Sequence, residues 1–438
     1  MDAQIRSFDD LKNKYEHIHF IGVGGAGMAP LAHLVLGIGC TVSGSDALWS
    51  SKLDELQEAG ATVYEGHEAG HLPESVDWVV ISSAIDETNP ELLLARRREL
   101  KVLRRGEFLA VLCGSFNRCV AIGGSHGKTS VTAMLSYLLR QCNVDCGFMI
   151  GGGVNEFPSF RLGDGDIFVT EVDESDGTIS CMYPEFGVLN NAEDDHAWSL
   201  GGVEQLKNIY RKFILQSRNF VCFNDDNILD LIPEDHENNL IIVPDDSVVP
   251  DNFIGFQRRN GQMAIALAML LGIDPEQAVE ALRSFPGVKR RMTVHYSTTD
   301  LVVIEDYAHH PTELKNSLEF LNLKYPNYHK CVIFQPHRVE RLKRYFNEFV
   351  EIFSGVDSVI VSEVFAAWLH DAGCSGKDLA DKLTMFNKNV YWGGNNLQFM
   401  ADLALNKVAA VNKPTVIAVI GAGDINNIFR FLPRENHI

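Results

Sequence analysis

The chain has 438 residues, of which 46% are hydrophobic and 22% charged, and its formal net charge is −20. A chain of this length is expected to form two or three domains with substantial cores. The acidic balance excludes a broad nucleic-acid surface, because phosphate backbones require clustered Lys and Arg. Small anionic substrates stay possible, since a few local basic groups suffice to bind them.

The expected location is the cytoplasm. Nine cysteines are scattered along the chain without a disulfide framework, which predicts reduced thiols. The N-terminal segment is polar and lacks the apolar stretch of a signal peptide. No uncharged run approaches the ~20 residues that a membrane helix needs, so we expect no membrane association.

Short apolar runs alternate with amphipathic stretches along the whole chain. Strands are predicted at residues 17–21, 40–43, 78–82, 119–122, 166–170, 186–189, 301–305, 330–334, 358–362 and 414–420. This βαβ rhythm indicates an α/β protein with parallel sheets. We expect three α/β units, at residues 1–113, 114–286 and 287–438.

A glycine-rich loop follows the predicted strand at 119–122 and precedes a predicted helix from about Ser130 to Leu139. It reads Gly-Gly-Ser-His-Gly-Lys-Thr and ends at Thr129. Backbone N–H groups and a helix N-terminus in this arrangement bind phosphates. Lys128 is expected to reach the β- and γ-phosphates of ATP, and the Thr129 hydroxyl to bind Mg²⁺. The spacing is one residue shorter than the full Walker pattern.

A second glycine-rich turn, Gly22-Val-Gly-Gly-Ala-Gly27, follows the first strand and opens a helix. Asp46 ends the next predicted strand. Taken alone, this pattern matches the dinucleotide fingerprint and favours NAD. The same geometry receives any nucleoside diphosphate, so the turn has to be interpreted beside the phosphate loop.

Acidic residues follow the next two predicted strands of the central unit. Glu171-Val-Asp-Glu-Ser-Asp176 directly follows one strand, and Asn190-Asn-Ala-Glu-Asp-Asp-His196 follows another. Carboxylates at the carboxyl end of a strand beside a phosphate loop suit Mg²⁺. His196 is either a further metal ligand or a residue that orients a ligand.

The third unit carries three polar clusters near predicted strands. They are Lys289-Arg-Arg291, Glu305-Asp-Tyr-Ala-His-His-Pro311 and Phe334-Gln-Pro-His-Arg338, the last followed by Arg341. We expect these clusters to share one cleft, in which guanidinium groups bind a carboxylate or phosphate.

Together these motifs resemble the Mur ligases, the ATP-dependent amide-forming enzymes of peptidoglycan precursor synthesis. The resemblance runs from about residue 17 to 425. It is carried, in chain order, by HIHFIGVGGAGM, SGSD, SSAI followed by NPE, GGSHGKTS, EVDESD, NNAEDDH, GVKRR, EDYAHHPTE, FQPHRVERL and GAGDI. The implied architecture is a Rossmann-like N-terminal domain, a central P-loop ATPase domain and a Rossmann-like C-terminal domain.

The resemblance implies a role for each matching residue. It implies that the substrates bind at Gly22, Gly24, Gly25, Ala26, Gly27, Ser45, Asp46, Ser83, His309 and His337, with uridine diphosphate at Gly22 to Gly27 and His337 at the amino-acid and acyl-phosphate site. It implies that ATP binds at Gly124, Ser125, His126, Gly127, Lys128, Thr129, Ser130, Asn260, Arg290, Arg291 and Asp306. The implied Mg²⁺ ligands are Thr129, Glu171 and His196, and the implied catalytic residues are Lys128, His196, Arg338 and Arg341.

The chemistry implied by the resemblance has two steps. The muramyl carboxylate attacks the γ-phosphate of ATP to give an acyl phosphate, and the amine of L-alanine then attacks that carbonyl and expels phosphate. Lys128, Mg²⁺ and arginines would neutralise the transferring phosphoryl group. Domain closure would exclude water from the acyl phosphate. The implied assembly is a monomer or a weak homodimer.

The central unit departs from the family pattern in two places. The family usually carries Gly-x-His-Asn-x-x-Asn before an Ala-rich helix, but here Arg259 stands at the His and Met263 at the second Asn. That second Asn normally contacts adenine, so Asn260 is the remaining candidate. The segment 224–256 is also shorter than in the family.

Four functions are compatible with the sequence. These are an alanine ligase, a recycling ligase that attaches a preformed tripeptide to UDP-N-acetylmuramate, a NAD-dependent oxidoreductase and a non-catalytic nucleotide-binding regulator. FQPHR and GAGDI favour the alanine ligase, whereas GVKRR somewhat resembles the tripeptide ligase. The oxidoreductase leaves GGSHGKTS without a role, and the retained Lys128 and Glu171 argue against a regulator.

Overall fold

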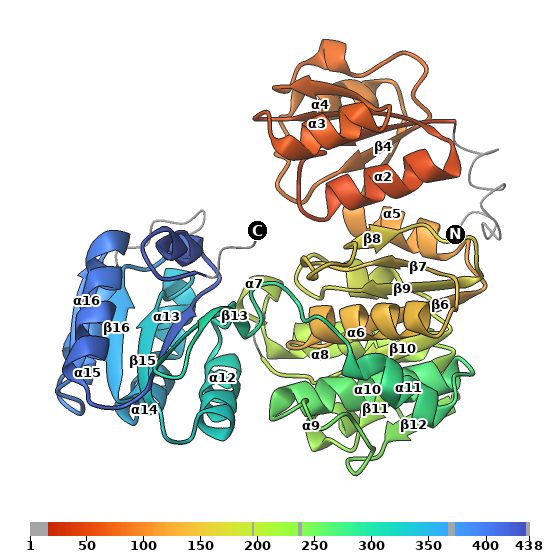
Figure 1. Ribbon diagram of the computed structural model, residues 1–438. Helices are drawn as coiled ribbons and strands as arrows, with labels where there is room; N and C mark the ends of the chain where they lie inside the picture. Colours follow the sequence, from red (N-terminus) through yellow and green to blue (C-terminus); the bar gives the residue numbers. More distant parts are fainter. Residues whose placement is uncertain (1–15, 195–196, 235–238, 367–372, 435–438) are drawn as a thin grey trace. The chain divides into compact units, whose positions relative to one another are not determined.

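The computed structural model describes residues 16–194, 197–234, 239–366 and 373–434. The chain forms two compact units (Figure 1). The first comprises Met1–Pro250 and Arg259–Pro286, and the second comprises Asp251–Arg258 and Gly287–Ile438. Each unit is described by itself below.

The described N-terminal part of the first unit is a five-stranded parallel sheet with the order β3-β2-β1-β4-β5. Its strands are β1 (His17–Ile21), β2 (Thr41–Asp46), β3 (Thr62–Glu65), β4 (Trp78–Ile81) and β5 (Lys101–Arg104). Its helices are α2 (Met28–Ile38), α3 (Ser51–Glu58), η1 (Ala69–His71), α4 (Pro90–Arg97) and α5 (Arg105–Cys113). The strand order reverses direction between β1 and β4, where open α/β sheets bind ligands.

The rest of the first unit is built on a seven-stranded sheet, counted over its described residues, with the order β12-β11-β10-β6-β9-β7-β8. Its strands are β6 (Arg118–Gly123), β7 (Cys146–Met149), β8 (Phe160–Arg161), β9 (Ile167–Glu171), β10 (Phe186–Leu189), β11 (Asn219–Phe223) and β12 (Asn239–Val243). Its helices are α6 (Lys128–Gln141), η2 (Thr178–Cys181), α7 (Ala197–Leu200), α8 (Val203–Gln216), α9 (Asp226–Leu229), α10 (Phe256–Leu270, which belongs to this unit from Arg259 on) and α11 (Pro275–Arg283). β6 lies between β10 and β9, which places the acidic segments on both sides of the phosphate loop.

Within residues 287–366 and 373–434, the second unit forms a six-stranded sheet with the order β13-β14-β18-β15-β16-β17. Its strands are β13 (Thr293–Ser297), β14 (Leu301–Asp306), β15 (His329–Phe334), β16 (Ser358–Ser362), β17 (Val390–Gly394) and β18 (Thr415–Ile420). Its helices are α12 (Pro311–Lys324), α13 (Val339–Arg344), α14 (Phe346–Ser354), α15 (Gly376–Leu383), α16 (Leu397–Ala410) and η3 (Asp424–Arg430). Only β13 is antiparallel among these described strands.

The predicted α/β class and parallel sheets are confirmed, and each predicted strand appears within three residues of its predicted ends. The reason is visible in burial: the middle residues of β6, β9, β15 and β18 are almost all fully buried, as expected for strands covered on both faces. Among the described residues, no helix is both long enough and apolar enough to span a membrane.

Helix α5 connects the two sheets of the first unit. Phe108 packs on Phe20 of the first sheet, with ring centroids 5.7 Å apart. The N-terminus of α5 approaches η2 of the second sheet so closely that a Cβ on Gly106 would lie 2.6 Å from the Cα of Thr178. A side chain larger than glycine has no space there, so this contact is tightly specified.

Candidate active site

The phosphate loop connects β6 to α6, which begins at Lys128. Gly124 and Gly127 have φ values of +118° and +81°, in the region that favours glycine. A Cβ on Gly127 would also lie 2.6 Å from the Oδ1 of Asn260. Both glycines are therefore required by the path of the loop, and the first-turn N–H groups of α6 are presented at its end.

Three asparagines hold this loop from behind. The Asn191 side chain accepts from the His126 N–H at 2.8 Å and donates to the His126 carbonyl at 2.9 Å. The Asn190 amide donates to the same carbonyl at 3.1 Å and to the Oδ1 of Asn260 at 3.0 Å. Asn260 is 4% exposed and Met263 is fully buried. The geometry thus places Asn260 as a support of the loop, and its predicted adenine contact stays a prediction.

Lys128 is enclosed by acidic groups. Its Nζ donates to the Gly124 carbonyl at 2.7 Å and to the Glu174 carboxylate at 3.1 Å. Burial lowers the pKa of Lys128, but the carboxylates of Glu174 and Asp173 outweigh this effect and raise the pKa above its usual value. The ammonium therefore stays charged at any physiological pH, as a phosphate-binding group must.

Thr129 and Glu171 form an oxygen pair beside Lys128. The Thr129 hydroxyl donates to the Glu171 carboxylate at 2.6 Å. A Cβ on Gly151 would overlap the Oε1 of Glu171, so the carboxylate occupies space that only a glycine at position 151 leaves open. These oxygens are ligands that Mg²⁺ prefers. The third predicted ligand, His196, lies outside the described residues.

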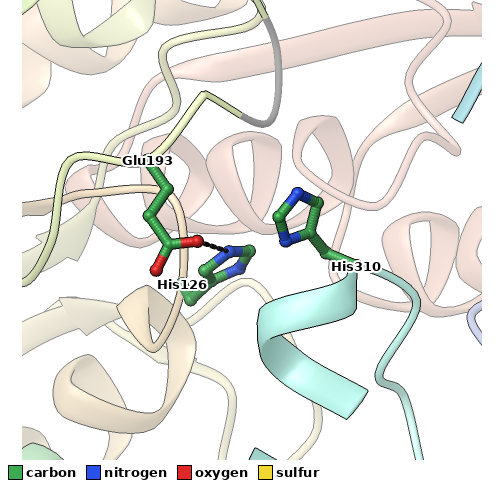
Figure 2. A group of neighbouring side chains, drawn as sticks. All are labelled: His126, Glu193 and His310. Atoms are coloured by element: carbon green, nitrogen blue, oxygen red, sulfur yellow. Dashed lines mark ion pairs between the residues drawn. The ribbon is translucent and has the colours of Figure 1, made fainter. Parts of the chain in front are cut away.

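The segment after β10 closes over the phosphate loop. The Ser125 hydroxyl donates to the Glu193 carbonyl at 2.7 Å and accepts from the Glu193 N–H at 2.9 Å. The Nε2 of His126 lies 3.5 Å from the Glu193 carboxylate, which is the dashed ion pair in Figure 2. His310, also drawn there, belongs to the second unit, where its side chain caps α12 by accepting from the Thr312 N–H at 3.4 Å. Ser130, also predicted to bind ATP, is buried in the first turn of α6.

The first glycine-rich turn is held by β2. The N–H groups of Gly22 and Val23 donate to the Ser45 carbonyl at 2.8 and 2.9 Å. The Asp46 carboxylate accepts from the Gly24 N–H at 2.8 Å. Asp46 therefore fixes the turn, and its predicted substrate contact stays a prediction. Of the other residues predicted to bind the UDP-sugar in this domain, Ala26 and Ser83 are exposed, and Gly25 and Gly27 are partly exposed.

A polar strip that is buried at its centre crosses one face of the first sheet, and sequence reasoning did not find it. We call it the buried polar strip and define it as His17, His19, Ser43, Ser45, His67, Ser75 and Glu91, of which His17 and His67 are partly exposed and Ser75 is exposed. Hydrogen bonds of 2.8–2.9 Å run from Ser75 through His17, Ser43 and His19 to Glu91. Glu91 also accepts from the Ser45 hydroxyl at 2.7 Å, and its carboxylate lies 2.9 Å from the Nδ1 of His67. Burial raises the pKa of Glu91, but hydrogen bonds from His19 and Ser45 outweigh this effect and lower it. The alternation His17-Ile-His19 was the available signal.

In the second unit, Arg290 braces the ends of neighbouring strands. Its Nε donates to the Glu305 carboxylate at 2.8 Å, and its Nη2 donates to the carbonyls of Gly421 and Gly423 at 2.8 and 3.0 Å. Its guanidinium also lies 4.8 Å from the centroid of the Tyr307 ring. The structure thus brings the GVKRR and EDYAHHP segments together, as predicted, and adds the GAGDI segment, which was not part of that prediction.

Asp306 and Arg291 lie deeper in the same unit. Asp306 is 3% exposed, accepts from the Met292 N–H at 3.2 Å and bonds to the Ser317 hydroxyl. Burial raises the pKa of Asp306, even though Arg291 acts in the opposite direction. Arg291 donates to Glu313 at 3.4 Å. The predicted ATP contacts of these two residues stay predictions.

The last predicted cluster follows β15. Arg341 is 2% exposed, and its Nη1 lies 3.3 Å from the Nδ1 of His337. The His337 ring stacks on Phe365 with centroids 5.6 Å apart and meets the His309 ring at 5.5 Å. Arg338 has a φ of +65°, a conformation that L residues rarely adopt and that is often found at functional sites. The second and third polar clusters therefore meet, as predicted.

Three family descriptions match consecutive parts of the chain. The Mur ligase family catalytic domain matches residues 17–117, the Mur ligase middle domain matches 122–245, and the Mur ligase glutamate ligase domain matches 290–423. The predicted resemblance is therefore confirmed, and it leaves no basis for the oxidoreductase or for a regulator without activity.

Relatives match nearly the whole length. UDP-N-acetylmuramate–L-alanine ligase of Desulfotalea psychrophila is 32% identical over 93% of this chain and 96% of its own, and that of Clostridium tetani is 32% identical over 96% and 98%. The solved UDP-N-acetylmuramate-alanine ligase of Thermotoga maritima has a TM-score of 0.75 at 27% identity, covering 95% of this chain and 98% of its own. A murein peptide ligase of Psychrobacter arcticus shares the fold, with a TM-score of 0.65 at 22% identity, covering 95% and 98%. The chain belongs to the Mur ligase family and is an ATP-dependent ligase that forms amide bonds.

Proposed function

We propose that this chain joins L-alanine to the carboxylate of UDP-N-acetylmuramate in the synthesis of peptidoglycan precursors, in the cytoplasm. The observation that carries this proposal is the similarity, over more than nine-tenths of the chain, to proteins named for this reaction. The solved structure of the Thermotoga maritima enzyme supports it as well, because its fold matches this chain over more than nine-tenths of both chains.

The phosphate loop carries the first half of the reaction. An oxygen of the muramyl carboxylate attacks the γ-phosphorus of ATP, the bond to the β-phosphate oxygen breaks, and ADP leaves. Lys128, charged and positioned by Glu174, stabilises the negative charge on the transferring phosphoryl group. The first-turn N–H groups of α6 hold the phosphates in place.

The oxygen pair of Thr129 and Glu171 is suited to Mg²⁺, and we propose His196 as a further ligand. The fit rests on two hard oxygen donors already 2.6 Å apart, in a space that Gly151 leaves open. Mg²⁺ bound there would neutralise charge on the β- and γ-phosphates. Thr129 and Glu171 would set the position of the Mg²⁺ charge beside the phosphate loop.

The second half of the reaction forms the amide. The amine of L-alanine attacks the carbonyl carbon of the acyl phosphate, phosphate leaves, and the nitrogen loses one proton. We propose that His337, Arg338 and Arg341 bind the acceptor carboxylate or the leaving phosphate. Guanidinium groups match both anions in geometry, and Arg341 is already oriented by His337.

The decisive experiment measures ADP release by the purified protein with UDP-N-acetylmuramate and one acceptor at a time. The acceptors are L-alanine, glycine, L-serine and the L-alanyl-γ-D-glutamyl-diaminopimelate tripeptide. We expect release with L-alanine at the highest kcat/KM. Release with the tripeptide alone would overturn the alanine assignment and select the recycling reaction instead.

A further inference from the structure

Arg105, the first residue of α5, lies against the first glycine-rich turn. A Cβ built on Gly27 would lie 2.9 Å from the Nη1 of Arg105 and 3.0 Å from its Cδ. Gly27 immediately precedes α2, so the guanidinium lies beside the start of this helix. No residue of the turn or of the first turn of α2 is basic.

A cation beside this turn would strengthen the binding of a diphosphate. Backbone N–H groups and a helix N-terminus attract an anion, but they carry only partial charges. A guanidinium adds a full charge and several N–H donors that match phosphate oxygens. Arg105 supplies that charge from another element of the same unit.

The other side of the Arg105 guanidinium is held by the acidic segment that follows β9. Its Nη2 forms an ion pair with Asp176 and donates to the Thr178 hydroxyl at 3.2 Å. Asp176 is five residues from Glu171, the partner of Thr129. The close packing of Gly106 on Thr178 leaves this part of α5 little freedom to move. Arg105 therefore touches both the first glycine-rich turn and the acidic segment.

We propose that Arg105 binds the diphosphate of the UDP-sugar, and that Asp176 orients its guanidinium for this contact. The inference rests on the proposed function, because it takes the first turn to be the UDP-sugar site. It adds a binding residue that lies outside the turn and that links the turn to the segment carrying Glu171.

Calorimetric titration of four proteins with UDP, uridine and UDP-N-acetylmuramate tests this proposal. The proteins are the wild type, Arg105→Ala, Asp176→Asn and the control Arg104→Ala, which removes an exposed neighbouring charge. We expect Arg105→Ala to weaken UDP and UDP-N-acetylmuramate by about 10- to 100-fold and to leave uridine unchanged, because a charged hydrogen bond is lost. Asp176→Asn should weaken UDP binding less than Arg105→Ala does, since the guanidinium stays but loses the carboxylate that orients it. Arg104→Ala should bind as the wild type does.

The two variants of the ion pair separate binding from structure. If the pair only holds α5 to η2, both variants weaken UDP equally, and the proposal is wrong. It is also wrong if Arg105→Ala binds UDP normally, or if only UDP-N-acetylmuramate weakens, which would place Arg105 on the muramyl carboxylate. Should Arg105→Ala fail to fold, Arg105→Lys keeps the charge but loses the planar donors, and we expect about a 10-fold loss. A wild-type protein that binds neither ligand would overturn the proposed function together with this inference.

Discussion

The two glycine-rich turns of the first unit both connect a strand to a helix, but they differ in whether the turn contains its own cationic side chain. The phosphate loop begins its helix with its own cation, Lys128, which is already bonded to Glu174. The first turn has no cation of its own, and Asp46 and the Ser45 carbonyl fix its backbone.

This difference follows from what each turn is proposed to do. A phosphoryl group that is transferred needs charge stabilisation built into the loop, because charge shifts during the reaction. A diphosphate that only anchors a substrate needs a stable shape, and a cation from a neighbouring helix suffices. The predictions below test this division between a reactive loop and an anchoring turn.

The largest effect is expected at the reactive loop. Lys128→Ala should lower ADP release about 1,000-fold, because the group that stabilises the transferring phosphoryl charge is lost. Initial rates of ADP release at saturating substrates measure this effect. Lys207→Ala, which removes an exposed lysine of α8 in the same unit, is the control and should be unaffected. A Lys128→Ala enzyme with near-normal rates would mean that the loop is not the reactive one.

A smaller effect is expected from a methyl group beside Glu171. Gly151→Ala should displace the carboxylate and raise the Mg²⁺ concentration needed for half-maximal rate by about 10- to 100-fold, the scale reported for disturbing a metal site's supporting residues. A Mg²⁺ titration of ADP release measures this shift.

Gly355→Ala is the matched control for that substitution, since nothing lies within 4 Å of the added carbon. An unchanged Mg²⁺ requirement in Gly151→Ala, together with normal stability, would contradict the assignment of Glu171 as a ligand.

If Asn260 only supports the phosphate loop, replacing it should weaken the binding of all nucleoside triphosphates equally. Asn260→Ala removes a hydrogen bond to Asn190 behind the loop, so the affinities for ATP and GTP should fall by the same factor, about 10-fold. Competition binding with both nucleotides measures it, and Met269→Ala, an exposed change on the same helix, is the control. A selective loss of ATP binding would show instead that Asn260 contacts adenine.

The smallest effect is expected in the pH dependence of the first sheet. Burial lowers the pKa of His17, so the stability it contributes is complete above its ordinary pKa of about 6.5 and is lost progressively below it. Glu91 also has a lowered pKa, so its contribution is complete above about 4.3 and is lost as the pH falls through that lowered value. Each group changes the free energy of unfolding by at most about 1.4 kcal/mol per pH unit.

Hydrogen exchange of peptides covering β1 and β2 measures this dependence. We expect protection to decrease in two steps on acidification, with the lower step absent in Glu91→Gln. A single step that this variant retains would assign the acid sensitivity to other groups.

The sequence predicted those features that depend on neighbouring residues. Apolar runs such as Val332-Ile-Phe334 gave the strands, and Gly127 before Lys128 gave the start of α6. The polar clusters of the second unit were predicted to meet because parallel strands end at one edge of the sheet. Each of these signals is contained in a short segment of the chain.

The missed features depend on contacts between distant segments. Nothing near Gly151 indicates that its missing side chain makes space for Glu171, and nothing near Arg105 indicates that it lies on Gly27. The same holds for Asn190 and Asn260, which are 70 residues apart. The Asp46 carboxylate likewise bonds to the N–H of Gly24, 22 residues away, and its predicted substrate contact stays a prediction.

The buried polar strip has a consequence for how this sheet can diverge. His19, Ser43 and Glu91 have side chains that are almost inaccessible to water, and each satisfies the next. Replacing one of them leaves a buried polar group without its hydrogen-bond partner, which lowers the free energy of unfolding by about 1–3 kcal/mol. Replacing all three with apolar residues avoids that cost. Among homologous sequences these three positions should therefore covary as a set, with isolated substitutions rare.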